Sequence, residues 1–196
     1  MASSDKECVT FLSSSHGKKN HHFPQMFLPL FKNSKRFEEK PDIRAIGGRI
    51  MDCDAICEVI NLATEVAPQK HTIILNLGDN NIRKHGHLPE VILCDYVEIV
   101  EQTRKIKNCR LVFTSLVPTF GRDEEYRNEF WRMSEHLKAL ARLNSHVSWC
   151  NFTKCLYKNG RLDPRNFQDD VHLSRSGAKI VAASLFTHLS NSPKIK

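Results

Sequence analysis

The chain has 196 residues, of which 40% are hydrophobic and 26% are charged, a balance typical of one globular domain that excludes a disordered or fibrous chain. Lysines and arginines number 29 against 22 aspartates and glutamates, a formal net charge of +7, so the surface is expected to attract polyanions such as nucleic acid, although an incidental charge explains the number equally well. No stretch approaches the roughly 20 apolar residues of a membrane span, and the N-terminus, MASSDKEC, lacks the apolar run of a signal peptide.

Apolar runs typical of strands alternate along the chain with apolar residues at helical spacing. The run TIILNL, residues 72–77, is continuous, as in a central strand that is covered on both faces. This alternation predicts a parallel sheet with helices packed on it. The expected strands span residues 8–12, 43–47, 72–77, 110–117 and 147–152.

The expected helices carry recognisable start signals. Asp52 and Ser174 are suited to N-cap positions, and Pro89 suits a first helical position, where a missing N–H costs nothing. An irregular helix is expected over residues 23–31 and a further helix after Asp123. The residues expected to face the core are Ile56, Val59, Ile60 and Ala63, then Ile92, Tyr96, Ile99 and Val100, then Phe130, Met133, Leu137 and Leu140, and finally Ile180, Val181 and Leu185.

A single domain is expected over residues 8–190. Residues 1–7 are expected to be a disordered or vector-derived N-terminus, and residues 191–196 a flexible basic tail. The abrupt start before a strand is also typical of a domain taken from a longer protein.

The cysteines predict a reduced, intracellular protein. They number seven, an odd count, and no Cys-x-x-Cys pair occurs. Cys53 and Cys57 would share a helix face, but without nearby histidines they are expected to fill the core and not to bind zinc. Neither a metal nor a cofactor is expected.

Polar segments follow the expected strands, and in a parallel sheet such segments converge on one edge, where ligands bind. In chain order they are SSSHGKK at residues 13–19, GGRI at 47–50, GDNNIRK at 78–84 and DDVHLSRSG at 169–177. This succession resembles the SGNH (GDSL-type) hydrolases over nearly the whole chain. The most specific part is the D-x-x-H-L-x-x-x-G stretch that contains Asp169, His172, Leu173 and Gly177. The resemblance implies a three-layer α/β/α, flavodoxin-like SGNH-hydrolase fold with a five-stranded parallel sheet.

The resemblance also implies a role for each matching residue. Ser15 stands at the nucleophile position, His172 would take its proton, and Asp169 would fix the tautomer of His172. The oxyanion would be held by the backbone N–H of Ser15, the N–H of Gly47 or Gly48, and the side-chain amide of Asn80. Taken singly, Asp169 could simply tie a loop and His172 could cap a helix.

The first of these polar segments, SSSHGKK, and the third, GDNNIRK, depart from the family pattern. Ser13 and Ser14 stand where working enzymes have Gly-Asp, and Asn81 stands where the family has an aspartate. A Cβ in a tight turn can displace the nucleophile by about an ångström, which can cost ~10²-fold in rate. The two missing carboxylates would leave the oxyanion hole less well braced, so the site is expected to be vestigial or impaired.

Basic residues recur in the segments at the expected ligand edge. Any one cluster could be a solvated face, but together they predict a groove for phosphates, which need several Lys or Arg contacts. The candidates for RNA binding are Lys18, Lys19, Lys35, Arg36, Arg44, Arg49, Arg83, Lys84, Arg161, Arg165 and Arg175.

Two further resemblances bear on function. The chain is similar to the C-terminal OSK domains of insect Oskar proteins, which implies RNA binding, ribonucleoprotein (germ-plasm type) assembly and mRNA localisation in cytoplasmic granules. It is also similar to esterase domains of LINE-type retrotransposons, which implies an active serine esterase for short acyl esters. The expected partners are single-stranded RNA, such as mRNA untranslated regions, and other ribonucleoprotein components. A protein-interaction module with incidental charge is the third alternative.

Overall fold

The computed structural model describes residues 6–14, 22–46, 48–65, 69–119 and 124–195. Five strands form one parallel sheet in the order β2-β1-β3-β4-β5, which is the flavodoxin-like order, so the predicted sheet is confirmed. The strands are β1 (Cys8–Ser13), β2 (Asp42–Ala45), β3 (His71–Asn76), β4 (Cys109–Thr114) and β5 (Val147–Cys150).

The order of the strands sets the position of the ligand edge. β1 pairs with β2 on one side, with Thr10 opposite Asp42, and with β3 on the other, with Leu12 opposite Leu75. The chain reverses its winding direction between β1 and β3, and in open α/β sheets the crevice at such a switch point lies at the carboxyl ends of the strands. Ser13, Ala45 and Asn76 end their strands at this edge.

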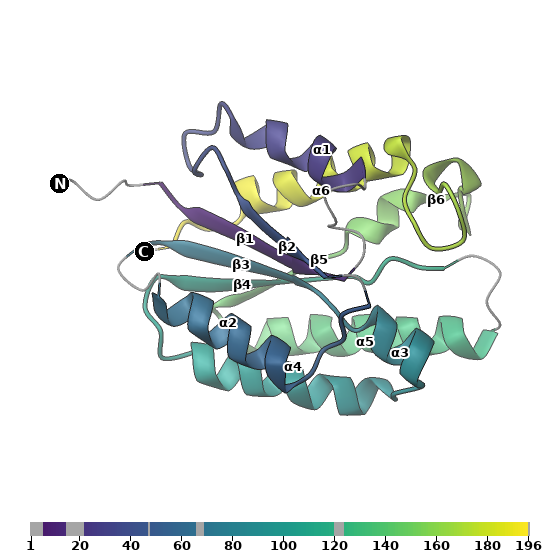
Figure 1. Cartoon of the computed structure of the whole chain (residues 1–196), viewed down its shortest axis with the longest axis horizontal. Helices are drawn as coiled ribbons and strands as arrows, with labels where there is room; N and C mark the ends of the chain where they lie inside the picture. Colours follow the sequence, from purple (N-terminus) through teal and green to yellow (C-terminus); the bar gives the residue numbers. More distant parts are fainter. Residues whose placement is uncertain (1–5, 15–21, 47, 66–68, 120–123, 196) are drawn as a thin grey trace.

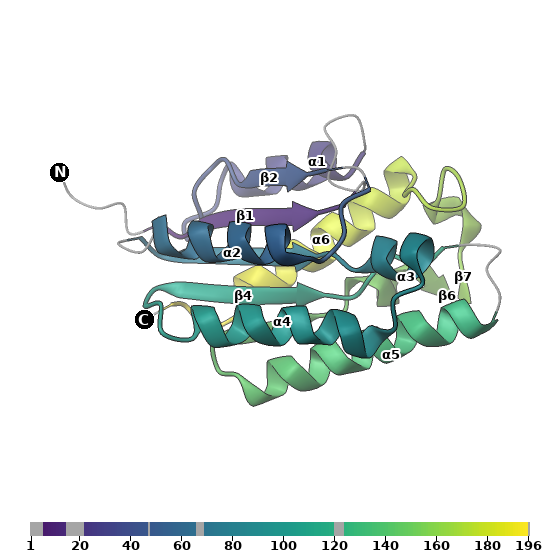
Figure 2. The same ribbon diagram turned by 60° about the horizontal axis from the view of Figure 1, so that its bottom comes forward.

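Helices cover both faces of the sheet (Figure 1), and the turned view shows the same layers (Figure 2). The helices on one face are α1 (His22–Phe27), which continues into the 3-10 turn η2 (Leu28–Phe31), and α6 (Arg175–Asn191). On the other face lie α2 (Cys53–Glu65), α3 (Asp79–His85), α4 (Pro89–Thr103) and α5 (Glu124–Leu143). Each face has its own apolar core, so the three-layer prediction is confirmed.

Most of the predicted core residues are buried. The stripe on α4 is fully confirmed, and Val59, Ala63, Phe130, Met133, Leu137, Val181 and Leu185 are also buried. Ile56 and Leu140 are only partly buried. Ile180 is 39% exposed, and its prediction was wrong because α6 instead packs small residues, Ala178 and Ala182, against the sheet.

Two parts of the chain contain elements that were not predicted. GDNNIRK is largely the helix α3, which begins after Gly78 at φ 111° and ends before Gly86 at φ 63°. The segment after β5 contains the 3-10 turns η3 (Phe152–Leu156) and η4 (Pro164–Asn166) and the hairpin β6 (Tyr157–Lys158) and β7 (Arg161–Leu162). Asn159 and Gly160 both have positive φ there, as the two-residue turn of a hairpin requires.

The cysteine prediction was wrong for α2. Cys53 and Cys57 are exposed, because this helix directs Ala55, Val59 and Leu62 to the core instead. Among the described residues, no group of three potential metal ligands comes together. Within the same ranges, no helix is long and apolar enough to cross a membrane.

Glu7 anchors both ends of the described chain at the amino edge of the sheet. It is only 2% exposed and forms ion pairs with Arg36 at 3.0 Å and with Arg110 at 2.8 Å. The same two guanidinium groups donate to the carbonyl of Pro193, beyond α6. The edge opposite the ligand edge is therefore closed by buried charges.

Candidate functional site

The Asp169–His172 pair lies on a turn just before α6. The turn is closed by a hydrogen bond from the Gln168 amide to the His172 carbonyl at 2.9 Å, and Ser174 donates its amide to the Asn166 carbonyl at 2.9 Å. Asp169 Oδ1 accepts from the amides of Val171 and His172, while Asp169 Oδ2 lies 2.8 Å from His172 Nδ1. The predicted pairing of these two side chains is present in the structure.

The electrostatics of Asp169 fix the tautomer of His172. Partial burial acts to raise the pKa of Asp169, but the hydrogen bonds from the side chain and amide of His172 and from the amide of Val171 outweigh it and lower this pKa to about 2. Because the carboxylate is ionised at neutral pH, it accepts a hydrogen bond from the Nδ1–H of His172. In the neutral imidazole Nε2 is then the acceptor, as a histidine general base requires.

Gly177 holds this turn close to α6. A Cβ on Gly177 would lie 2.1 Å from the carbonyl oxygen of Asn166, closer than atoms can approach. The first turn of α6 therefore packs directly on the backbone of η4, and Ser174 caps the helix by accepting from the Gly177 amide. The glycine of the D-x-x-H-L-x-x-x-G stretch is required here for a close approach of two backbones.

Asn80 lies in the first turn of α3 beside the 48–51 segment. Its Nδ2 donates to the Arg49 carbonyl at 2.9 Å, and its Oδ1 accepts from Arg83 at 2.6 Å. Its side chain is fully buried. Gly48, with φ 81°, adopts a left-handed conformation, and a Cβ on it would lie 3.5 Å from Lys84 Nζ. Asn80 and Gly48, two residues predicted for the oxyanion hole, thus both lie at the 48–51 segment, where Gly48 faces Lys84.

Asn81 braces the same segment, so the expected loss of support at this position was wrong. Its Oδ1 accepts from the Met51 amide at 2.7 Å, and its Nδ2 donates to the Met51 carbonyl at 2.8 Å. An amide offers both a donor and an acceptor, whereas a carboxylate offers only acceptors. Asn81 is therefore suited to pairing with both backbone groups of one residue.

Asp79 is a buried carboxyl group next to Ser14. Asp79 is 5% exposed, and its Oδ1 has no hydrogen-bond partner among the described residues. Burial raises the pKa of Asp79, against the lowering effects of the Ser14 hydroxyl and the Arg83 charge. Ser13 and Ser14 are both fully buried. The predicted residues Ser15, Gly47, Lys18 and Lys19 lie outside the described residues.

The candidate basic residues lie in different environments. Lys84, Arg161 and Arg175 are exposed in segments at the carboxyl edge, and no ion pair joins them to any described residue. Arg44 and Arg165 are ion-paired but partly exposed, whereas Arg49 is nearly buried beside Glu58. Arg83 donates to Asn80.

Arg36 and Lys35 do not belong to the ligand edge. Arg36 donates to Glu7 and to the carbonyls of Leu189 and Pro193, and its side chain is 13% exposed. The expectation that Arg36 contacts a ligand at the ligand edge was wrong, because Arg36 lies at the opposite, amino edge and bonds Glu7 and the end of α6 there. Lys35 is exposed directly beside it.

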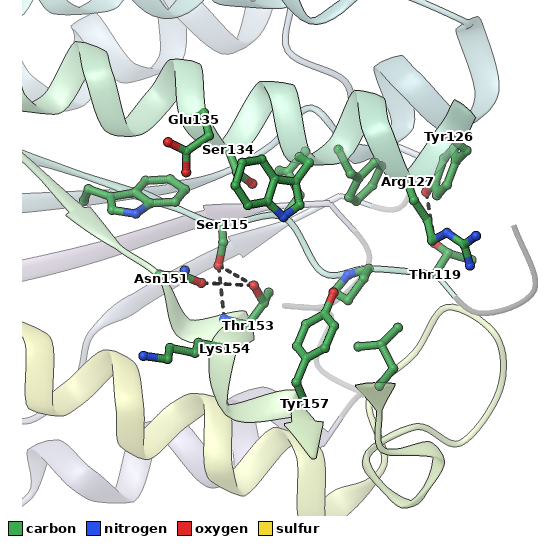
Figure 3. Close-up of a pocket in the computed structure, with 16 residues that line it drawn as sticks. Ser115, Thr119, Tyr126, Arg127, Ser134, Glu135, Asn151, Thr153, Lys154 and Tyr157 are labelled. Atoms are coloured by element: carbon green, nitrogen blue, oxygen red, sulfur yellow. Dashed lines mark hydrogen bonds between the residues drawn. The ribbon is translucent and has the colours of Figure 1, made fainter. Parts of the chain in front are cut away.

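A cavity of about 410 Å³ was missed by the sequence reasoning (Figure 3). It opens between α5, the ends of β4 and β5, and the β6–β7 hairpin, and no described residue predicted for catalysis lines it. A signal was present in the sequence, since Trp131 lies on the outward face of a strongly amphipathic helix. An exposed tryptophan of this kind is informative about binding.

Comparison with solved structures identifies the fold. A member of the lipolytic G-D-S-L family from Veillonella parvula matches with a TM-score of 0.75 at 14% identity, over 95% of this chain and 100% of the other. A GDSL-like lipase from Bacteroides thetaiotaomicron matches at 0.70 and 16% identity, over 95% and 88%. A carbohydrate acetylesterase from Sinorhizobium meliloti matches at 0.66 and 15% identity, over 94% and 99%.

These likenesses establish the three-layer α/β/α fold of the SGNH hydrolases. A scan against protein-family models and a search of curated proteins find no match.

Proposed function

We propose that this chain is an RNA-binding domain built on an SGNH-hydrolase scaffold, with impaired hydrolysis and a role in cytoplasmic ribonucleoprotein assembly. The observation that carries the proposal is a set of cations at the carboxyl edge that form no ion pair with any described residue. Lys84 comes from α3, Arg161 from the hairpin and Arg175 from the start of α6, and all three are exposed. Cations that are not neutralised by carboxylates are suited to phosphate contacts, which supply most of the affinity for a polyanion.

The burial and hydrogen bonding of the Asn80 side chain support impaired hydrolysis. An oxyanion-hole donor must be aimed at the position where charge develops in the transition state. Asn80 is instead fully buried, and its amide already bonds the Arg49 carbonyl. The Ser13-Ser14 sequence in place of Gly-Asp supports the same conclusion.

The role in germ-plasm type assembly and mRNA localisation extends the resemblance to the OSK domains. Single-stranded RNA, including mRNA untranslated regions, is the proposed partner, with other ribonucleoprotein components bound alongside it.

Binding of RNA is tested with charge variants at the two edges of the sheet. The test variant combines Lys84→Ala, Arg161→Ala and Arg175→Ala, and the control combines Lys105→Ala, Lys107→Ala and Arg142→Ala, which are exposed at or near the amino edge. Both remove three charges, so their net charges stay equal. The test variant should bind a labelled single-stranded RNA at least about tenfold more weakly than the control. An equal loss of RNA affinity in the test and control variants would show that RNA is bound only by diffuse charge. That result would favour a protein-interaction module.

Ester hydrolysis is the second candidate, and the Asp169–His172 hydrogen bond is the observation that favours it. This bond orients His172 as a general base would be oriented next to a serine nucleophile. Hydrolysis of a short-chain p-nitrophenyl ester by wild type and by Ser15→Ala tests it. We expect wild type and Ser15→Ala to hydrolyse the ester at the same background rate. A rate that falls by ~10³-fold or more in Ser15→Ala would show an active serine esterase.

A further inference from the structure

The cavity beside α5 is lined by an unusual concentration of aromatic side chains. Trp131 is 70% exposed and Tyr157 is 46% exposed, and both line it together with the partly buried Trp149. Two of the large exposed apolar side chains of the described residues therefore face one hollow. Figure 3 shows Tyr157 reaching toward it from the β6 side, opposite α5.

The floor of the cavity is polar. The Ser115 hydroxyl accepts from the Thr153 amide at 3.1 Å, and the Thr153 hydroxyl lies 3.2 Å from Asn151 Oδ1 (Figure 3). Asn151 is exposed and its carboxamide offers a donor and an acceptor side by side. Flat aromatic walls with a donor–acceptor pair are suited to a planar ring that has polar edges.

The rim of the cavity is mainly basic. Arg127 and Lys154 line it, and Glu135, the one acidic residue among the described residues of the lining, is ion-paired with Lys138 at 3.1 Å. A second hollow follows the β6–β7 hairpin and shares Leu162 with the cavity. Its lining contains Lys158, Arg161 and Arg165 against Asp163 alone, so a basic path leads away from the aromatic walls.

We propose that the aromatic cavity receives one unpaired base of a single-stranded RNA whose phosphates continue along the basic β6–β7 hairpin. The inference rests on the proposed function and specifies where the bases bind. Aromatic stacking next to a cationic groove is the usual means of holding single strands, because every base has a π-face. A neutral sugar ring could also stack there, but it has no negative charge for the basic rim to bind.

The tryptophans of the chain are an intrinsic fluorescent probe of this cavity. The chain has two tryptophans, and both line the cavity, so the intrinsic tryptophan emission reports on this place alone. Titration with a single-stranded RNA of about 12 nucleotides should quench the emission with the same midpoint as binding measured by anisotropy. A duplex of the same sequence, whose bases are stacked internally, should bind without comparable quenching.

Two substitutions separate stacking from charge. Trp131→Ala and Tyr157→Ala should each weaken single-strand affinity about fivefold or more, and leave duplex affinity unchanged. Leu143→Ala is the matched control, because Leu143 is 82% exposed on the same helix and lies outside the cavity. It should bind like wild type.

The outcomes distinguish this inference from the proposed function. Wild-type affinity in both aromatic variants, with the carboxyl-edge charge variant still impaired, would overturn the base site and leave RNA binding standing. Quenching by a neutral oligosaccharide but not by RNA would also overturn it. Absence of any RNA binding by the wild type would overturn both.

Discussion

Arg36 and Lys35 are neighbours in the sequence, but their side chains meet opposite environments. Arg36 is inserted between Glu7 and the carbonyls of Leu189, in the last turn of α6, and Pro193, and its guanidinium also lies 4.9 Å from the ring centroid of Phe37. Lys35 is exposed. Composition and spacing count both residues as surface cations, so only the tertiary fold separates a structural arginine from a solvated lysine.

Arg36→Ala is therefore expected to destabilise the fold. It leaves the Glu7 carboxylate, 2% exposed, with only one of its two cations, so the free energy of unfolding should fall by about 3 kcal/mol. The exposed control Lys35→Ala should change it by no more than about 0.5 kcal/mol. Urea unfolding measures both. Equal effects of the two substitutions would show that the amino edge is not held by this cluster.

Asp79 is expected to make stability depend on pH. Burial raises its pKa, so the folded state favours the protonated acid, and this contribution is present at low pH and lost as pH rises through the folded-state pKa. Asp79→Asn removes the ionisable group, so its gain in melting temperature should be larger at pH 8 than at pH 4. Asp54→Asn, on the exposed start of α2, is the control. A gain independent of pH would contradict the burial of an ionisable Asp79.

Elements with a clear period were predictable, and elements defined by a turn were not. The five strands and five of the helices follow from apolar runs or apolar stripes, since burial of a face imposes the pattern. α3 has only seven residues and begins in a block that was interpreted as a loop. The Asn159–Gly160 dipeptide is a known hairpin signal, but its strands have two residues each, too few to show alternation.

Packing of α6 against η4 predicts a strict requirement for glycine at position 177. Gly177→Ala places a Cβ against the Asn166 backbone and should cost about 1–3 kcal/mol or more of stability. Lys179→Ala, exposed on the same helix, should leave the melting temperature nearly unchanged. Thermal unfolding by circular dichroism compares them. A fully stable Gly177→Ala variant would contradict the close approach that positions the Asp169–His172 turn.

At the scale of the whole molecule, some of the cations that give the net charge of +7 are in ion pairs and others are exposed. At the amino edge, Arg36 and Arg110 both pair with the single charge of Glu7, and elsewhere Arg49 and Arg44 both pair with Glu58 of α2. Arg110 and Glu7 are separated by 103 positions, so no sequence pattern could have paired them. The carboxyl edge keeps Lys84, Arg161 and Arg175 exposed. The Asp169–His172 pair was predictable from the resemblance of its D-x-x-H stretch to the SGNH hydrolases, whereas the cations that have no ion pair among the described residues could be identified only in the fold.

The salt dependence of RNA affinity tests the central proposal most directly. Dissociation constants for a single-stranded RNA are measured over a range of salt for the wild type and for the Lys84, Arg161 and Arg175 triple alanine variant. If each cation contacts a phosphate, the slope of log affinity against log salt should become shallower by about one per contact removed. An unchanged slope, or RNA affinity equal to that of an unrelated protein of the same charge, would contradict an RNA-binding carboxyl edge.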